Sequence, residues 1–296
     1  MAVSRVTQGM MTQRALSSLQ LGLGRLATTQ EQISTGKRLN RPSDSPTDTV
    51  AAMRVRSSLA DQRQYVRNAE DGQGWLYQAD STLQGMVDQV RRVRDLAMQG
   101  ATTIVAATDA REALATEVDQ LREGLLAAAN TTYLGRPIFG GVTAGSAAYD
   151  ASGTYSGTTG DVARVIGDGS TVVVNVDGPD VFGPDGANLF DELTALAASL
   201  RAGDTTAVGA ALTGLDAAST RMTTVLAEVG TKESRVERAL QTAQDAILDM
   251  TSSLSDLEDV DLPRATVDLQ MQEVAYQAAL ATTAKVVQPS LLEFLR

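Results

Sequence analysis

The densest cluster of chemically active side chains is an acidic run close to the C-terminus. It consists of Asp256, Glu258, Asp259 and Asp261. Carboxylates spaced this closely could act as acid and base in a hydrolysis or could bind a hard cation. The run lacks the ligand spacing and the central glycine of a calcium-binding EF-hand. We therefore interpret it as a solvated helix end and keep a carboxylate-dependent hydrolase as a distant alternative.

Other motifs with possible chemistry are incomplete. The chain has neither histidine nor cysteine, which excludes Ser-His-Asp and Cys-His nucleophiles and the commonest zinc ligands. Residues 22–27 have the letters of a dinucleotide-binding turn but follow no strand. A phosphate loop at residues 35–37 fails because Glu31 replaces a required glycine, and Asn130 begins a short glycosylation pattern of the kind that arises by chance. The sequence predicts no enzyme, no cofactor and no metal site.

The distribution of charge is uneven. The net charge of −11 argues against a nucleic-acid partner and an anionic membrane. Residues 1–60 have eight basic and three acidic side chains (+5), and residues 241–296 have three basic and nine acidic ones (−6). Opposite charges favour the two ends lying together. The N-terminus lacks the features of a cleaved signal peptide, and no apolar run is long enough to span a membrane.

Helices with heptad spacing, in which apolar residues lie alternately three and four positions apart, dominate the sequence. Near the N-terminus the stripe consists of Leu16, Leu19, Leu23, Leu26 and Ile33. Further stripes run through residues 76–97, 114–128, 215–229 and 236–257. A separate stripe near the C-terminus consists of Val267, Met271 and Val274 and continues to Leu291, Leu292 and Leu295. Periodicity alone does not say whether a stripe packs within the chain or between subunits.

The apolar stripes at residues 215–229 and 236–257 do not share one heptad phase. The junction falls at residues 231–234, as a four-residue stutter would produce. Residues 212–258 could still form one helix. The stutter either fits a local change of helical neighbours or lets one helix present different faces at its two ends.

Capping residues mark the predicted end of the first helix and the start of the second. Gly36 is suited to end the first helix, with Lys37 and Arg38 beside its negative end. Ser45 can cap the next helix, with Pro46 at its first position and Asp48 completing a capping box.

Residues 140–187 differ in kind from the rest of the chain. Eleven of the 25 glycines fall here. Residues 162–166 and 171–176, separated by a Gly-Asp-Gly turn, predict a β-hairpin. The whole sequence therefore predicts a mainly α fold: an elongated helical bundle or coiled-coil rod with paired N- and C-terminal helices and a small β-rich insert.

A loop motif at residues 30–46 resembles the flagellin superfamily. Members carry a Ser-(Thr/Ser)-Gly-Lys-Arg segment after the first helix, and the Asn-Arg-Pro-Ser-Asp-x-Pro segment is closer to members at the hook–filament junction than to filament flagellins. The matching residues are Gly36, Lys37, Arg38, Asn40, Arg41, Pro42, Ser43, Asp44 and Pro46. Residues 135–141, 229–237 and 276–295 resemble three further segments of the family, with Pro137 in place of a usual tyrosine.

The resemblance implies a three-part plan. Residues 1–40 with 260–296 would form a terminal helical pair (the inner tube domain), residues 41–140 with 188–259 a helical-bundle rod, and residues 141–187 a small outer domain. The terminal stripes would mediate helix pairing and assembly. The glycine content and the hairpin pattern of this outer domain predict that it contributes little to the core of the rod.

The resemblance also implies a structural role in the extracellular flagellum, as a ring that connects hook to filament. The partners would be further copies of the chain, hook-associated protein 1 and flagellin, with an export chaperone on the C-terminal helix. Export would need no cleaved signal. A filament flagellin is an alternative that the Asn40–Pro46 loop and the small insert disfavour. A generic coiled-coil adaptor is another, and it would leave the hairpin insert and the terminal motifs unexplained.

Overall fold

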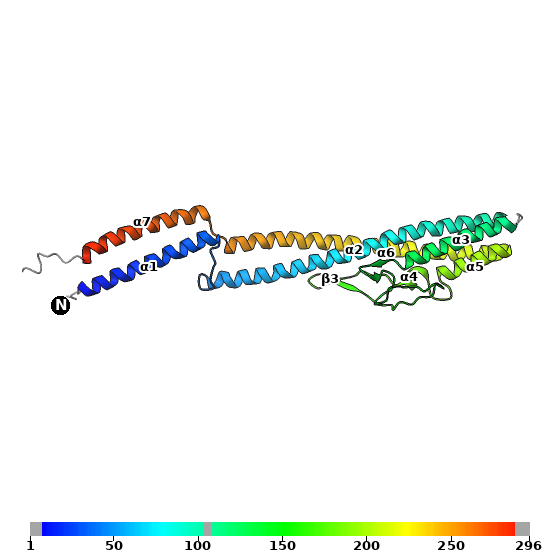
Figure 1. The fold of residues 1–296 in the computed structure, drawn as a ribbon, viewed down its shortest axis with the longest axis horizontal. Coiled ribbons are helices and arrows are strands. Elements are labelled where there is room, and N and C mark those ends of the chain that lie inside the picture. Colours follow the sequence, from blue (N-terminus) through cyan, green and yellow to red (C-terminus); the bar gives the residue numbers. More distant parts are fainter. Residues whose placement is uncertain (1–7, 104–107, 288–296) are drawn as a thin grey trace, which may run out of the picture. The chain divides into compact units, whose positions relative to one another are not determined.

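The computed structural model describes residues 8–103 and 108–287 of the chain. Contacts between residues divide it into two compact units. Unit 1 comprises Met1–Ala60 with Ile247–Arg296, and unit 2 comprises Asp61–Ala246. The mainly α fold class with paired terminal helices and a small β-rich insert is confirmed (Figure 1). Over the described residues, no helix is long and apolar enough to cross a membrane.

Unit 2 is a helical bundle with a continuous apolar core. Its helices are α3 (Thr108–Ala129) and α5 (Leu189–Ala202), the part of α2 (Pro46–Thr103) from residue 61 onward, and the part of α6 (Thr205–Glu258) up to residue 246. Helix α3 packs along α5 (Figure 1). Leu76, Leu83 and Met86 on α2 and Leu215 and Met222 on α6 are fully buried in one cluster. The heptad stripes in this unit therefore pack within the chain.

The predicted β-hairpin is present in the insert. Strand β3 (Ala163–Gly167) pairs antiparallel with β4 (Ser170–Val173), with Arg164 opposite Val172 and a bulge between Val165 and Gly167. A shorter hairpin, β1 (Thr132–Tyr133) with β2 (Arg136–Pro137), precedes it, and the short helix α4 (Gly178–Phe182) follows. Leu134 and Gly135 form the turn of the shorter hairpin with φ of 50° and 78°, as a type I′ turn requires.

The insert is not peripheral to the core, which corrects the expectation that it contributes little to the bundle. Val172 and Val174 from the hairpin, and Phe182 from α4, are buried in the same apolar cluster as the helices. Phe182 packs edge-on against Phe139, with ring centroids 5.3 Å apart, and also contacts Phe190 of α5. Although aromatic residues are only 4% of the chain, those of the insert gather at one point and join it to the bundle.

The four-residue stutter leaves α6 unbroken, because the helix runs through residues 231–234. Lys232 and Glu233 are half-buried there. Lys232 lines a cleft with Asp161 and Asp177 of the insert, and Arg235 donates to Ser170 Oγ on β4 at 3.4 Å. The phase shift therefore coincides with the point where the insert packs against α6, which favours a local change of neighbours.

Unit 1 is built around an antiparallel pair of helices. Helix α1 (Gln8–Thr35) lies along α7 (Leu262–Val287), as Figure 1 shows in blue and red. Thr29 Oγ1 donates to Gln272 Oε1 at 3.2 Å. A Cβ added at Gly22 would lie 3.5 Å from the ring of Tyr276. The unit also includes the first turns of α2 and the last turns of α6.

Candidate assembly surface and linker site

The contact between α1 and α7 uses one heptad stripe from each helix. The buried or half-buried residues along the contact are Ala15, Leu19, Gly22, Leu26, Thr29 and Ile33 on α1, and Ala265, Leu269, Gln272, Tyr276, Ala279 and Thr283 on α7. Of the residues predicted for pairing, Leu19, Leu26 and Ile33 lie on this stripe. The spacing of three and four matches the heptad pattern of helices packed side by side.

The other predicted pairing residues are exposed. Leu16 and Leu23 on α1 each keep 53% of their surface, and Val267, Met271 and Val274 on α7 keep 55%, 62% and 67%. Helix α7 carries a second stripe that begins at Ala265, two residues before Val267. Two residues correspond to about 200° around a helix, so the two stripes lie on opposite faces. Sequence periodicity alone could not show which of these two stripes of α7 packs against α1.

We name the exposed apolar residues Val267, Met271 and Val274 the α7 apolar stripe. Leu291, Leu292 and Leu295, predicted to continue it, lie outside the described residues. That these residues serve assembly stays a prediction.

The segment after α1 pairs with the end of α6. Helix α1 stops at Thr35, and Gly36 follows with φ of 70°, the left-handed conformation expected of a glycine at a helix end. The Arg38 amide donates to the Glu258 carbonyl at 2.6 Å, and the Val260 amide donates to the Gly36 carbonyl at 3.1 Å. These two bonds tie the two chain segments together.

Ion pairs surround this junction. Lys37 Nζ donates to Asp259, and Arg38 Nη2 bonds Asp48 at 3.0 Å and the Leu257 carbonyl at 2.8 Å. The hydrogen bond to Asp259 raises the pKa of Lys37 above its usual value. The bonds from Lys37 and Ser255 lower the pKa of Asp259. Lys37 and Arg38 therefore hold the segment after α1 against the end of α6.

The loop that follows is organised by Asp44. Its carboxylate accepts from the amides of Asn40 at 3.0 Å and Arg41 at 2.7 Å. The Asn40 side chain donates to the Lys37 carbonyl at 3.0 Å, and the guanidinium of Arg41 lies 3.3 Å from Glu31. The Asp44 amide also donates to the Arg41 carbonyl at 3.0 Å, so Asp44 closes a tight turn just before α2.

The start of α2 follows the predicted cap in part. Pro46 is its first residue, and Ser45 Oγ accepts from the Asp48 amide at 3.4 Å. The Asp48 carboxylate bonds Arg38 rather than completing a capping box. Ser43 is exposed in the loop.

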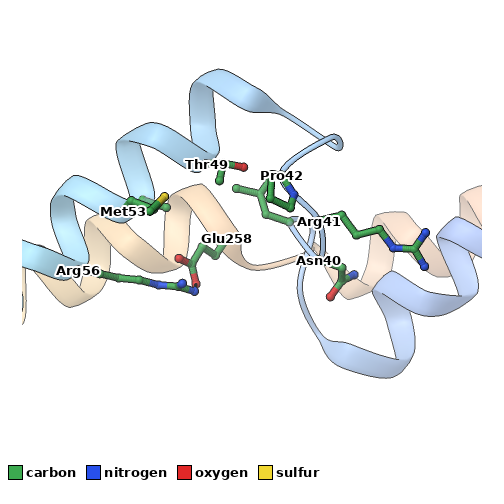
Figure 2. A pocket seen from close by; sticks show the side chains of 9 residues that line it. Asn40, Arg41, Pro42, Thr49, Met53, Arg56 and Glu258 are labelled. Atoms are coloured by element: carbon green, nitrogen blue, oxygen red, sulfur yellow. Dashed lines mark hydrogen bonds and ion pairs between the residues drawn. The ribbon is translucent and has the colours of Figure 1, made fainter.

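A cleft of about 290 Å³ opens between the loop, α2 and the end of α6 (Figure 2). Its lining residues are Leu39, Asn40, Arg41, Pro42, Thr49, Ala52, Met53, Arg56 and Glu258. Glu258 is buried, with 5% of its side chain exposed, and its Oε2 lies 2.9 Å from Arg56 and 3.7 Å from Lys37. Glu258 Oε1 and Thr49 Oγ1 are buried without a hydrogen-bond partner among the described residues.

Two of the other sequence motifs have structural uses. In the acidic run, Glu258 and Asp259 pair with basic side chains, and Asp261 accepts from the Arg264 amide at the start of α7 at 3.1 Å. The Asn130 side chain bonds the backbone of Ala148 and Tyr149. Residues 22–27 lie within α1. In the described ranges, no group of three or more acidic side chains is placed to hold a metal ion.

Sequence reasoning missed Arg56, Thr49 and Met53 as parts of this site. They lie on one face of α2 with Ala52, at spacings of three and four residues, which was the available signal. Their partner Glu258 is about 200 positions away in the sequence, so no local pattern could connect them.

Comparisons with known proteins define the family. The bacterial flagellin N-terminal helical region matches residues 6–144, and the bacterial flagellin C-terminal helical region matches residues 212–295. The chain therefore belongs to the flagellin family.

Individual relatives come from both hook-associated proteins and flagellins. The chain is 27% identical over 317 residues to flagellar hook-associated protein 3 of Salmonella typhimurium, covering 99% of this chain and 100% of that one. It is 25% identical over 316 residues to flagellin FlaB2 of Treponema pallidum, covering 100% of both. A flagellar hook-associated protein structure from Vibrio parahaemolyticus shares the fold, with a TM-score of 0.67 and 17% identity over 73% of this chain and 100% of that one.

Proposed function

We propose that this chain is a structural protein of the bacterial flagellum that connects the hook to the filament by self-assembly at their junction. The α7 apolar stripe is the observation that supports self-assembly most directly. A single chain leaves Val267, Met271 and Val274 more than half exposed on one helical face. Apolar faces of this kind are buried when helices of neighbouring copies pack together.

The junction, rather than the filament, is supported by the loop and by the relatives. The Asn40–Pro46 segment has the sequence typical of junction members, and hook-associated protein 3 matches the chain over its full length. A ring of copies would then meet hook-associated protein 1 on one side and flagellin on the other. Export would proceed without a cleaved signal, with a chaperone on the C-terminal helix.

Filament flagellin is the second candidate, since flagellin FlaB2 also matches the whole chain. The two roles differ in how far assembly continues. A purified filament protein polymerises alone into long filaments, whereas a junction protein stops at a limited ring. Negative-stain electron microscopy of the purified chain distinguishes these outcomes.

The decisive experiment is deletion of the gene in its own bacterium. We expect hooks without filaments, with flagellin shed into the medium, and restoration of filaments by the intact gene. Normal filaments in the deletion strain would contradict the junction role. Loss of the filament with no flagellin in the medium would point to the filament subunit itself.

A further inference from the structure

The turn of the β1–β2 hairpin holds a leucine in an unfavourable backbone conformation. Leu134 has a φ of 50°, and among the described residues it is the only one besides glycines with a positive φ. Residues with a Cβ atom are disfavoured in this left-handed region, and type I′ turns prefer asparagine, aspartate or glycine at this position. Leucine therefore makes the turn less stable than asparagine would.

Packing within the chain does not compensate for this conformation. Leu134 keeps 77% of its surface exposed, more than any other large apolar side chain of the described residues. The rest of the hairpin is anchored, because Tyr133 packs edge-on against Trp75 with ring centroids 5.7 Å apart and Ile138 is fully buried. An exposed apolar side chain that destabilises its own turn, on an anchored hairpin, indicates a binding role.

The cleft beside the linker has the shape and the surface to receive such a side chain. Leu39, Pro42 and Met53 supply apolar wall, and Met53 keeps 63% of its surface exposed. The lining comes from the loop, α2 and the end of α6, and the volume of about 290 Å³ leaves room for one aliphatic side chain. The α7 apolar stripe lies along one helix and has no second wall, so it suits a helix rather than a single side chain.

The rim of the cleft carries hydrogen-bond donors. Arg41 and Arg56 line the cleft, and 68% and 61% of their side chains are exposed. Arg41 pairs with Glu31 and Arg56 with Glu258. A guanidinium has five N–H groups, so each arginine keeps donors for a further acceptor. Because both charges are already balanced by carboxylates, a neutral group with free carbonyls suits this rim.

The hairpin tip, which we define as Leu134 and Gly135, supplies such carbonyls. None of the described residues donates a hydrogen bond to either carbonyl oxygen. The next residue, Arg136, donates to the Val142 carbonyl at 3.4 Å, so its guanidinium is engaged by the insert. The hairpin tip therefore combines an apolar side chain with two neutral acceptors.

We propose that Leu134 of one copy inserts its side chain into the cleft of a neighbouring copy, between Pro42 and Met53, with the tip carbonyls facing Arg41 and Arg56. This contact rests on the proposed self-assembly and specifies one point where two copies meet. The hairpin tip and the cleft are different surfaces, so each copy offers the tip to one neighbour and the cleft to another. A contact of this heterologous kind continues into a ring or a helical array.

Cysteine cross-linking tests the contact, because the chain has no native cysteine. A strain without the native gene would co-express a tagged Leu134→Cys chain with an untagged Met53→Cys chain, and its isolated flagella would be oxidised mildly. We expect a disulfide-linked dimer of tagged and untagged chains. The matched control pairs Met53→Cys with Val165→Cys, at an exposed apolar residue of the other hairpin, and should give no dimer.

The outcomes separate this proposal from the proposed function. Flagella that contain both chains without a cross-link between Leu134→Cys and Met53→Cys overturn the docking site and leave the junction role intact. Equal cross-linking from Val165→Cys also overturns it, because the contact is then not specific to the hairpin tip. The intact chain, tagged and expressed in parallel, is the reference: its absence from flagella contradicts the proposed function, and the docking site fails with it.

A second variant separates binding from folding. Leu134→Asn places a residue that the turn prefers, so the purified chain should melt at a higher temperature. The same variant loses the apolar contact, and roughly tenfold less of it should enter flagella at limiting expression. Val165→Asn, the matched control, should be incorporated like the native chain. A lower melting temperature for Leu134→Asn would show that Leu134 serves the fold, and unchanged incorporation would show that it binds no neighbour; either result overturns the proposal.

Discussion

Unit 2 and unit 1 use the same heptad pattern with opposite results. In unit 2, the stripe residues Leu83 and Met222 are fully buried, and the insert adds Phe182 to the same cluster. In unit 1, the stripe residues Leu23 and Val274 keep 53% and 67% of their surface. Both units have apolar residues at spacings of three and four, but only unit 2 has enough helices to enclose them.

The difference shows where the chain depends on neighbours. A bundle that buries its stripes is stable by itself, because apolar burial is the main favourable contribution to folding. In a pair of helices, each helix buries one face against its partner and leaves the opposite face exposed. Unit 1 is therefore the part of the chain suited to packing against other copies, and unit 2 is the part suited to folding independently.

The largest effect on stability is expected at the insert. Phe182→Ala should destabilise unit 2 by about 3–5 kcal/mol, because it removes a fully buried ring that contacts several other aromatic residues. Denaturant unfolding followed by the fluorescence of Trp75, buried in the same cluster, measures it. Val165→Ala, on the hairpin but 45% exposed, is the control and should stay within about 0.5 kcal/mol. Equal effects of the two would mean that the insert does not belong to the core.

An opposite result is expected on the α7 apolar stripe. Val274→Asp should leave the unfolding of the purified chain unchanged within about 0.5 kcal/mol, because Val274 is already exposed. Incorporation into flagella should be lost, since an unpaired carboxylate in an apolar contact is strongly destabilising. Immunoblots of isolated flagella measure incorporation. Tyr77→Asp, at an exposed residue of unit 2, should be incorporated normally; loss there as well would remove the distinction between the units.

A smaller effect is expected at the linker. Asp259→Asn should speed amide hydrogen exchange in residues 36–40 at neutral pH, since it removes the negative charge that pairs with Lys37 and leaves a weaker, neutral acceptor. The pKa of Asp259 is lowered in the folded state. The stabilisation from its ion pair with Lys37 is therefore present above the ordinary carboxyl pKa of 3.8, and it is lost as pH falls through the folded-state pKa. The raised pKa of Lys37 removes the contribution again as pH rises through a value above 10.5. The difference in exchange rate between the variant and the native chain should shrink at low pH and at high pH. A difference that stays the same at both extremes of pH would contradict the ion pair.

The smallest effect is expected at Glu233 on α6. Burial, followed by the nearby charges of Asp80 and Glu237, raises the pKa of Glu233. The ionised form is therefore disfavoured in the folded state, and native stability should fall as pH rises from 4.5 through the folded-state value. Glu233→Gln should raise the unfolding midpoint slightly at pH 7 and remove that fall. Asp245→Asn, at an exposed position on the same helix, serves as the control. A lower midpoint for Glu233→Gln would show that the charge is stabilising.

The positions of helices, turns and caps were predictable because they depend on neighbours in the sequence. Heptad spacing identified the buried faces of α2 and α6, and the Gly-Asp-Gly turn identified the hairpin. Gly36 ends α1 with a positive φ, as its place after a helical run predicts. The motif loop identified the family before any contact was known.

Contacts between distant segments required the tertiary structure. Which stripe of α7 faces α1 depends on how both helices leave the linker, and the two stripes look alike in sequence. The burial of the insert depends on Phe139, Phe182 and Phe190 meeting from different segments. The pairing of Arg56 with Glu258 joins residues 202 positions apart. The sequence by itself determined the local conformation and the family, since these depend on short-range sterics and periodicity. The fold alone decided which apolar faces stay open and which carboxylate lacks a partner, because burial depends on how the whole chain packs.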